Sequence, residues 1–371
     1  MDFSAIILLN SDQSTTGFAG HHLATIDVLG RSPLLRVVHE LERLNVSRIT
    51  VLTEIGDPVL SLPPRLNYLS FDRNRAAEAA NRILEQANRF SPDSLILAIR
   101  LCPYAEIDYA DLLRFHQQQD RNVTAVFENE SDAPCAFVVD TTRRNELAYL
   151  IRHTFSTVRH PFSIYPFVGY SNPLSTIADL RRLAIDSFCH NAKLRPIGIE
   201  QRPGIWIGHG ASIHPRARIV APAFIGAHSK VRACALVTRC SVLEHHVHVG
   251  AGAMVENATL LPATSIGPAL DVARAVAGFR RLVDLRRNVE VEMTDSRLLG
   301  QVSAAPVRFV EHLASLAAFL PSQFLRGLAS SNGNGKIPPM PTIGQPPYPA
   351  LAPAEQEFPA HLAGVRRYGD D

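Results

Sequence analysis

Ten consecutive six-residue repeats, covering residues 207–266, constrain the fold of this chain more than any other feature. The first residue of every repeat is aliphatic, and the fifth is small or β-branched. A strict period of six fits neither an amphipathic helix nor a plain alternating strand. It predicts a parallel β-helix, in which three repeats make one coil and Ile207, Ile225 and Leu243 stack inside one face. The ten first positions are Ile207, Ile213, Ile219, Ile225, Val231, Val237, Leu243, Val249, Val255 and Leu261.

Histidine is concentrated in the repeats that would share one face of this coil. Residues 18 apart should stack in neighbouring coils at roughly 4.8 Å, so His228 and His246 should lie one above the other. Three interpretations stay open. An outward histidine acts as general base in hexapeptide-repeat acyltransferases; the face could instead be solvated or pack against another subunit; or it could bind a metal, although stacked histidines lack the usual mixed ligands. The histidines, which we expect to point outward or to sit at corners, are His209, His228, His245, His246 and His248.

The first 200 residues alternate predicted strands with predicted helices. Strands that alternate with helices indicate an α/β domain with a mostly parallel sheet covered on both faces. The strands are expected at 4–9, 48–52, 95–99, 123–127 and 136–139, and the helices at 32–44, 75–87 and 109–118.

Short motifs in this region resemble the nucleoside-diphosphate-sugar pyrophosphorylases, a family of sugar nucleotidyltransferases. Residues 27–35, DVLGRSPLL, are similar to the turn that enters the family's first helix, and residues 93–97 to its central strand. Residues 106–108 resemble its metal turn, while Gly169-Tyr170 and 177–180 resemble the segment that closes its sugar pocket. A left-handed hexapeptide β-helix follows the catalytic domain in this family. The resemblance therefore covers residues 1 to about 266 and implies a Rossmann-like nucleotidyltransferase domain followed by a left-handed parallel β-helix.

The family's catalytic residues are largely missing at the matching positions. The resemblance places the nucleotide loop at Asn10, Ser11, Thr15, Thr16 and Gly17, and this loop has one glycine and no basic residue. The family's loop lysine falls near His22 or Leu23, and its metal-binding aspartates fall at Cys102 and near Pro173. Phosphoryl chemistry needs a cation and carboxylate-held Mg²⁺ at the phosphates. The candidates that could substitute are His22, Glu106 and Asp108.

Three functions follow from these patterns. The first is a pyrophosphorylase-like protein of nucleotide-sugar or surface-polysaccharide metabolism, catalytically impaired and acting as a regulatory or scaffolding subunit. The second is an active nucleotidyltransferase that transfers a nucleotide to a sugar 1-phosphate with Mg²⁺, and the third is an acyltransferase working on the β-helix. We expect a nucleotide or sugar nucleotide as ligand and Mg²⁺ as the cofactor of an active site only. We also expect a homo-oligomer, or a hetero-oligomer with an active homologue.

Composition adds limits on partners and compartment. A net charge of +2 argues against a nucleic-acid partner. No apolar run reaches membrane-spanning length, and the five cysteines are scattered, so we expect a reduced, cytoplasmic protein without a transmembrane segment.

The predicted boundaries divide the chain into four parts. The C-terminal part should begin with a helix at 271–291 that caps the open end of the coil, followed by a second amphipathic helix at 307–328. The four parts are a nucleotidyltransferase-like domain (1–200), a β-helix (201–268), a helical cap (269–330) and a disordered proline-rich tail (331–371).

Overall fold

The structure is a computed structural model of the whole chain. It divides into two compact units, Met1–Ala304 and Ala305–Asp371. The residues described below belong to the first unit, and they are 3–9, 17–54, 66–71, 95–119, 123–128, 134–140 and 163–302. The helices expected at 75–87 and 307–328 and the proline-rich tail lie outside the described residues.

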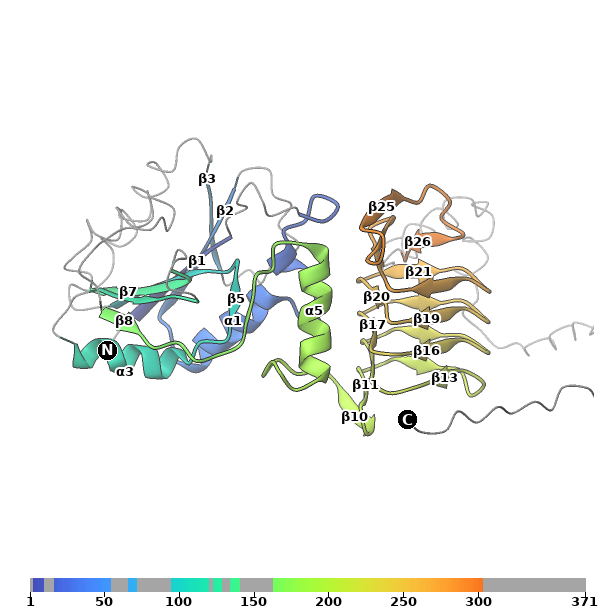
Figure 1. Cartoon of the computed structure of the whole chain (residues 1–371), viewed down its shortest axis with the longest axis horizontal. Helices are drawn as coiled ribbons and strands as arrows, with labels where there is room; N and C mark the ends of the chain where they lie inside the picture. The colour runs from blue at the N-terminus through green and yellow to red at the C-terminus, as the bar shows by residue number, and fades with distance from the viewer. Residues whose placement is uncertain are drawn as a thin grey trace, which may run out of the picture. The chain divides into compact units, whose positions relative to one another are not determined.

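A seven-stranded mixed sheet forms the N-terminal region, with strand order β3-β2-β1-β4-β7-β6-β8 (Figure 1). The strands β3, β2, β1 and β4 are parallel to one another, and β8 is parallel to β6, whereas β7 runs antiparallel to both β4 and β6. Almost every residue of β4 is buried, as expected for a strand covered on both faces. The strands are β1 (Phe3–Leu8), β2 (Arg48–Glu54), β3 (Asn67–Phe71), β4 (Leu95–Arg100), β6 (Val123–Val126), β7 (Ala136–Asp140) and β8 (Ser163–Tyr165).

Each of the three α-helices in the described residues begins at a side-chain cap. Ser32 caps α1 (Pro33–Arg43), which has proline at its start, and Asp108 caps α3 (Tyr109–Gln118). A reciprocal pair, Thr176 and Asp179, caps α5 (Ile177–Phe188). The helices predicted at 32–44 and 109–118 are thus confirmed. A single 3-10 turn, η1 (Leu23–Thr25), precedes α1, and the two-stranded pair β5 (Tyr104–Ala105) and β9 (Ser171–Asn172) precedes α5.

Three parallel sheets form the repeat region, defined here as residues 205–278. Successive strands pass from one sheet to the next, and each pairs with the strand one coil later. Ile207, Ile225 and Leu243 occupy consecutive ladder positions in one hydrophobic cluster, so their predicted stacking is confirmed. The first sheet contains β11 (Ile205–Ile207), β14 (Ala223–Ile225), β17 (Ser241–Leu243), β20 (Thr259–Leu260) and β23 (Ala275–Gly278); the second contains β12 (Ser212–Ile213), β15 (Lys230–Val231), β18 (His248–Val249) and β21 (Thr264–Ile266); the third contains β13 (Arg218–Ile219), β16 (Leu236–Thr238), β19 (Met254–Glu256) and β22 (Asp271–Ala273).

The period of six is broken at two corners, one within the predicted repeats and one after Val272, and neither was expected from the sequence. Val237 pairs with Val255, 18 residues later, but Leu243 pairs with Leu260, 17 residues later. Two left-handed residues, at 239 and 240, make the corner in one coil, and only one, Asn257, makes it in the next. Leu260 therefore fills the interior in place of the predicted Leu261, which packs in the hydrophobic cluster of the N-terminal region.

The helical cap expected at 271–291 is wrong, because these residues form strands. The coil continues past residue 266: Val272 pairs with Val255 and Val276 with Thr259. Val272 and Ala277 fill the interior, and the new strands pair with the backbone of the preceding coil, which outweighs a helical spacing in the sequence. Two antiparallel strands, β24 (Arg281–Asp284) and β25 (Val289–Glu292), then extend the first sheet, and β26 (Leu299–Gln301) extends the second. At its other end β10 (Ile199–Arg202) pairs antiparallel with β11.

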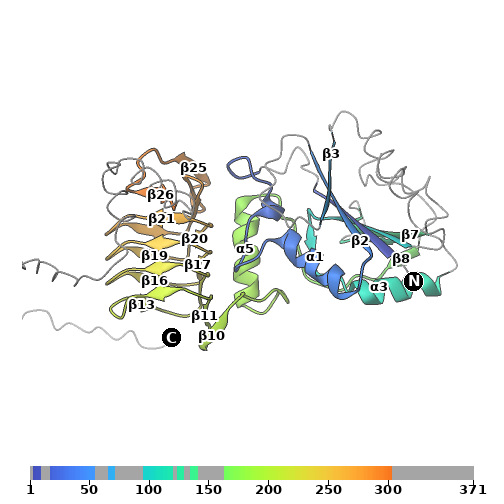
Figure 2. The same ribbon diagram turned by 180° about the vertical axis from the view of Figure 1, so that it is seen from behind.

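The outer surface of the first sheet packs against the N-terminal region. Phe224, Val242 and Val276 point away from the interior of the coil and belong to the same buried cluster as Leu29 and Leu34. Figure 2 shows α5 beside this sheet, as does the opposite view. The two regions therefore share one continuous core along this contact, called the junction below.

Candidate functional site

Gly17 is the only residue of the predicted nucleotide loop within the described residues; Asn10, Ser11, Thr15 and Thr16 lie outside them. A Cβ added at Gly17 would lie 2.8 Å from the carbonyl oxygen of His21, so the backbone approach needs glycine. Phe18 and His21 exchange backbone hydrogen bonds of 2.9 Å across a tight turn. The loop that follows β1 thus ends in a closed turn.

His22 lies against Cys102, the residue that replaces the family's metal aspartate. The imidazole Nε2 is 3.9 Å from the Cys102 Sγ, and both side chains are buried. The Nδ1 of His22 accepts a hydrogen bond from the backbone N–H of Ala24, 3.2 Å away, and so caps η1. An accepting Nδ1 assigns the neutral tautomer with its proton on Nε2. The segments after β1 and β4 therefore meet at an imidazole and a thiol side chain.

The acidic candidates bind the protein's own backbone. The Glu106 carboxylate accepts hydrogen bonds from the backbone N–H groups of Lys193 (2.8 Å) and Leu194 (2.9 Å). Asp108 accepts from the N–H of Asp111 at 3.0 Å as the cap of α3. Nowhere in the described residues do three or more His, Cys, Asp or Glu side chains gather as a metal site would require.

Four of the five predicted histidines lie in contact with one another, forming a histidine column (His209, His228, His245 and His246). The rings of His228 and His246 are stacked, with centroids 5.1 Å apart, as the repeat predicted. His209 meets His228 at 5.7 Å, and His245 meets His246 at 5.6 Å. Burial, together with the charges of His245 and His228, lowers the pKa of His246. The fifth histidine, His248, lies in β18 of the second sheet.

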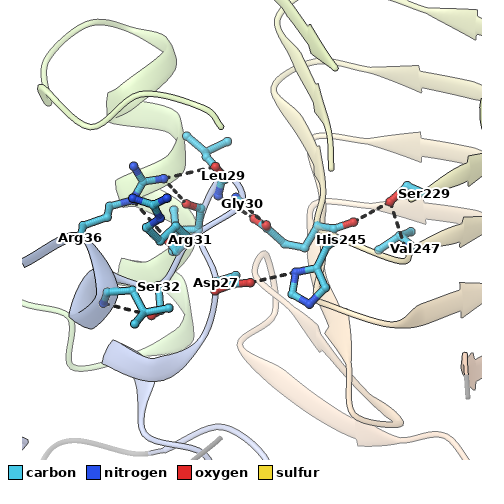
Figure 3. Close-up of polar contacts among 12 residues, drawn as sticks. Asp27, Leu29, Gly30, Arg31, Ser32, Arg36, Ser229, His245 and Val247 are labelled. Carbon is cyan, nitrogen blue, oxygen red and sulfur yellow. Dashed lines mark hydrogen bonds and ion pairs between the residues drawn. The ribbon is translucent and has the colours of Figure 1, made fainter. Parts of the chain in front are cut away.

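His245 is partly exposed, and it also binds the N-terminal region. Its Nδ1 lies 2.9 Å from a carboxylate oxygen of Asp27 (Figure 3). This hydrogen bond raises the pKa of His245, since it favours the imidazolium form, and partial burial opposes it. His245 sits at the corner after β17, as expected of these histidines, but there it contacts the N-terminal region instead of standing free.

Glu244 is the central residue of the junction, and no motif in the sequence pointed to it. Its carboxylate is fully buried and accepts hydrogen bonds from the backbone N–H groups of Leu29 (2.7 Å) and Gly30 (2.8 Å). Burial, followed by the nearby charge of Asp27, raises the pKa of Glu244 to about 7, while the two N–H groups oppose this. A buried carboxyl with so high a pKa beside a second carboxylate is typical of functional or switching sites.

The two backbone donors project from a turn at residues 27–31, here called the junction turn. Leu29 and Gly30 both have left-handed backbone angles, with φ of 55° and 90°. Arg36 of α1 holds this turn from behind by donating to the carbonyl oxygens of Val28 (2.8 Å) and Leu29 (3.2 Å) (Figure 3). The motif that carried the family resemblance is therefore the element that contacts the repeat region.

No known family model matches this chain, and no curated protein matches its sequence. Within the described residues, none of the helices is sufficiently long and apolar to cross a membrane.

Proposed function

We propose that this chain is a sugar-nucleotide pyrophosphorylase-like protein of nucleotide-sugar or surface-polysaccharide metabolism that acts as a regulatory or scaffolding subunit and does not transfer nucleotides. The observation that carries the proposal is the state of its three catalytic candidates. His22 caps η1 and contacts Cys102, Glu106 binds two backbone amides, and Asp108 caps α3. Each side chain that could have replaced a missing catalytic group is engaged in holding the fold.

The proposed fold is a Rossmann-like nucleotidyltransferase domain carried on a left-handed parallel β-helix. Support comes from the parallel β3-β2-β1-β4 order and from the three parallel sheets whose strands pair 17 or 18 residues apart. The loops after parallel strands are where ligands bind in open α/β sheets, and the segments after β1 and β4 meet at His22 and Cys102.

The chemistry of these two side chains argues against pyrophosphorylase turnover. Attack on an α-phosphate requires stabilisation of developing negative charge by a cation and by Mg²⁺ held on oxygen ligands. A buried thiol and a neutral imidazole supply neither a cation nor oxygen ligands, so the residues present do not fit Mg²⁺ at the first metal position. We therefore expect the chain to bind nucleotides without turning them over.

Two assays on the full-length chain test this proposal together. We expect sugar nucleotides or nucleoside triphosphates to raise the melting temperature, and pyrophosphate release from a triphosphate and a sugar 1-phosphate with Mg²⁺ to stay at background. Gly17→Ala should abolish the thermal shift, because its Cβ would meet the His21 carbonyl. Family-like turnover that is lost in Asp108→Asn would overturn the proposal and establish a relocated metal site. A chain that binds none of these ligands would overturn it as well.

The Asp27–His245 pair favours an acyltransferase as the second candidate. A carboxylate 2.9 Å from an imidazole is the arrangement that orients a general base. Consumption of acyl-CoA that is lost in His245→Gln would support this function, and the same thermal-shift assay with acyl-CoA distinguishes it from the first proposal.

A further inference from the structure

Three titratable side chains meet at the junction, and they come from two regions far apart in the sequence. Asp27 belongs to the junction turn, and Glu244 and His245 belong to the corner that follows β17. Both sides of this contact are braced. Arg36 holds the turn, and the Ser229 hydroxyl holds the corner by donating to the Glu244 carbonyl (2.7 Å) and accepting from the Val247 N–H (3.0 Å) (Figure 3).

We propose that the junction is a proton-linked latch, in which mildly acidic pH holds the junction turn on the repeat region and rising pH releases it. This inference goes beyond the proposed function and does not depend on it, because it concerns only the contact between the two regions. The latch consists of the buried Glu244 carboxyl on two backbone amides and of the Asp27–His245 ion pair beside it.

The charges around the latch come from both regions. Asp27, Arg31, Arg36 and Tyr104 stand on the N-terminal side, and the charge of Arg36 interacts with Tyr104, Glu244, Arg31 and Asp27. The repeat region contributes His245 and, behind it, His246 stacked on His228. Arg36 has a lowered pKa because of its burial, yet it stays charged at neutral pH.

Both proton-binding groups of the latch act in the same direction. Glu244 has a pKa of about 7 when docked, because of burial and Asp27, and an exposed glutamate has a pKa near 4.3. The docked carboxyl therefore holds a proton between these values that the released one has lost. His245 has a raised pKa when docked, because of its bond to Asp27, so its contribution is complete below about pH 6.5 and is lost as pH rises through the docked value.

Docking therefore takes up protons, so the docked state is favoured at lower pH. Release should become easier as pH rises from about 5 and should level off above the docked pKa values, where both states are deprotonated. Each proton taken up changes the release equilibrium by up to about tenfold per pH unit. A protonated Glu244 still accepts from one amide through its carbonyl oxygen, so the contact survives protonation.

Hydrogen exchange of the full-length chain tests the latch directly. We expect the protection of a peptide covering 27–36, corrected for the intrinsic effect of pH, to fall at least about tenfold between pH 5.5 and pH 8.0. A peptide covering α3, which lies away from the junction, reports on global unfolding and should not follow this slope. Wild-type protection that does not change with pH would overturn the latch.

Single variants separate the contributions of the two groups. His245→Gln and Glu244→Gln should each reduce the pH slope at 27–36, because neither amide titrates. His39→Gln is the matched control: this histidine lies on α1 with a side chain 54% exposed, and it should keep the wild-type slope. If Glu244→Gln unfolds the chain, the pH dependence of protection at 27–36 in His245→Gln becomes the deciding measurement. A wild-type slope in His245→Gln would then overturn the latch.

Discussion

At the scale of single residues, the junction depends on contacts that no local pattern reveals. Glu244 meets two amides more than 200 residues earlier in the chain, and its place in the repeat differs in no obvious way from other outward positions. The stacking of His228 on His246 could be predicted from the sequence, because a fixed period places residues 18 apart in register. The Glu244 contact could not be predicted from the sequence, because it depends on how two folded regions dock.

Gly30 offers a sharp test of this docking. Its φ is +90°, and a Cβ would lie 3.0 Å from the Cβ of Ile197 and 3.1 Å from the ring of Phe224. Gly30→Ala should therefore lower the free energy of unfolding in urea by about 2 kcal/mol, through backbone strain and crowding at the junction. Gly252→Ala is the control, because its φ is +70° with open space around the Cβ, and it should cost only about 1 kcal/mol. Equal losses would show that Gly30 is not tightly packed.

At the scale of elements, the sequence predicted helices and strands whose apolar residues follow one clear period. The prediction failed where the same residues fit both a helical period and the period of six. Helical spacing over 32–44 and 109–118 located α1 and α3. Val272 and Val276 fit a helix as well as they fit the next coil, and hydrogen bonding to the exposed edge of the previous coil decided for strands. The shift from Leu261 to Leu260 arose at a corner, where a single left-handed residue leaves no strong signal.

A buried arginine of helix α5, Arg181, should strengthen its attachment to the coil. Arg181 donates to the Cys240 carbonyl (2.6 Å), the Asn257 side chain (2.9 Å) and the Thr259 hydroxyl (3.1 Å). Arg181→Met keeps most of the volume but leaves these buried acceptors unpaired, so it should cost about 2–3 kcal/mol in urea unfolding. Its neighbour Arg182 is 72% exposed, and Arg182→Met should change the stability by less than about 0.5 kcal/mol. A smaller loss in Arg181→Met than in Arg182→Met would refute this role.

At the scale of the whole molecule, the latch and the exposed part of the histidine column should respond to pH in opposite directions. His245 is engaged within its own chain, which leaves His209, His228 and His246 as the histidines that a second subunit could cover. Burial and neighbouring charge already lower the pKa of His246, so its neutral form is favoured here. A contact through this surface would disfavour the charged form further and release protons on assembly.

We therefore expect an oligomer that weakens as pH falls from about 7.5 to about 5.5, the range that spans an ordinary histidine pKa. Sedimentation velocity across this range measures the effect, and His228→Gln with His246→Gln should make assembly less sensitive to pH. His190→Gln, an exposed histidine outside the repeat region, serves as the control. A monomer at every pH would exclude the oligomer, and a pH-independent oligomer would exclude the histidine surface as its contact. Because the latch tightens in the same acid range, hydrogen exchange at 27–36 and sedimentation should change in opposite senses in one titration.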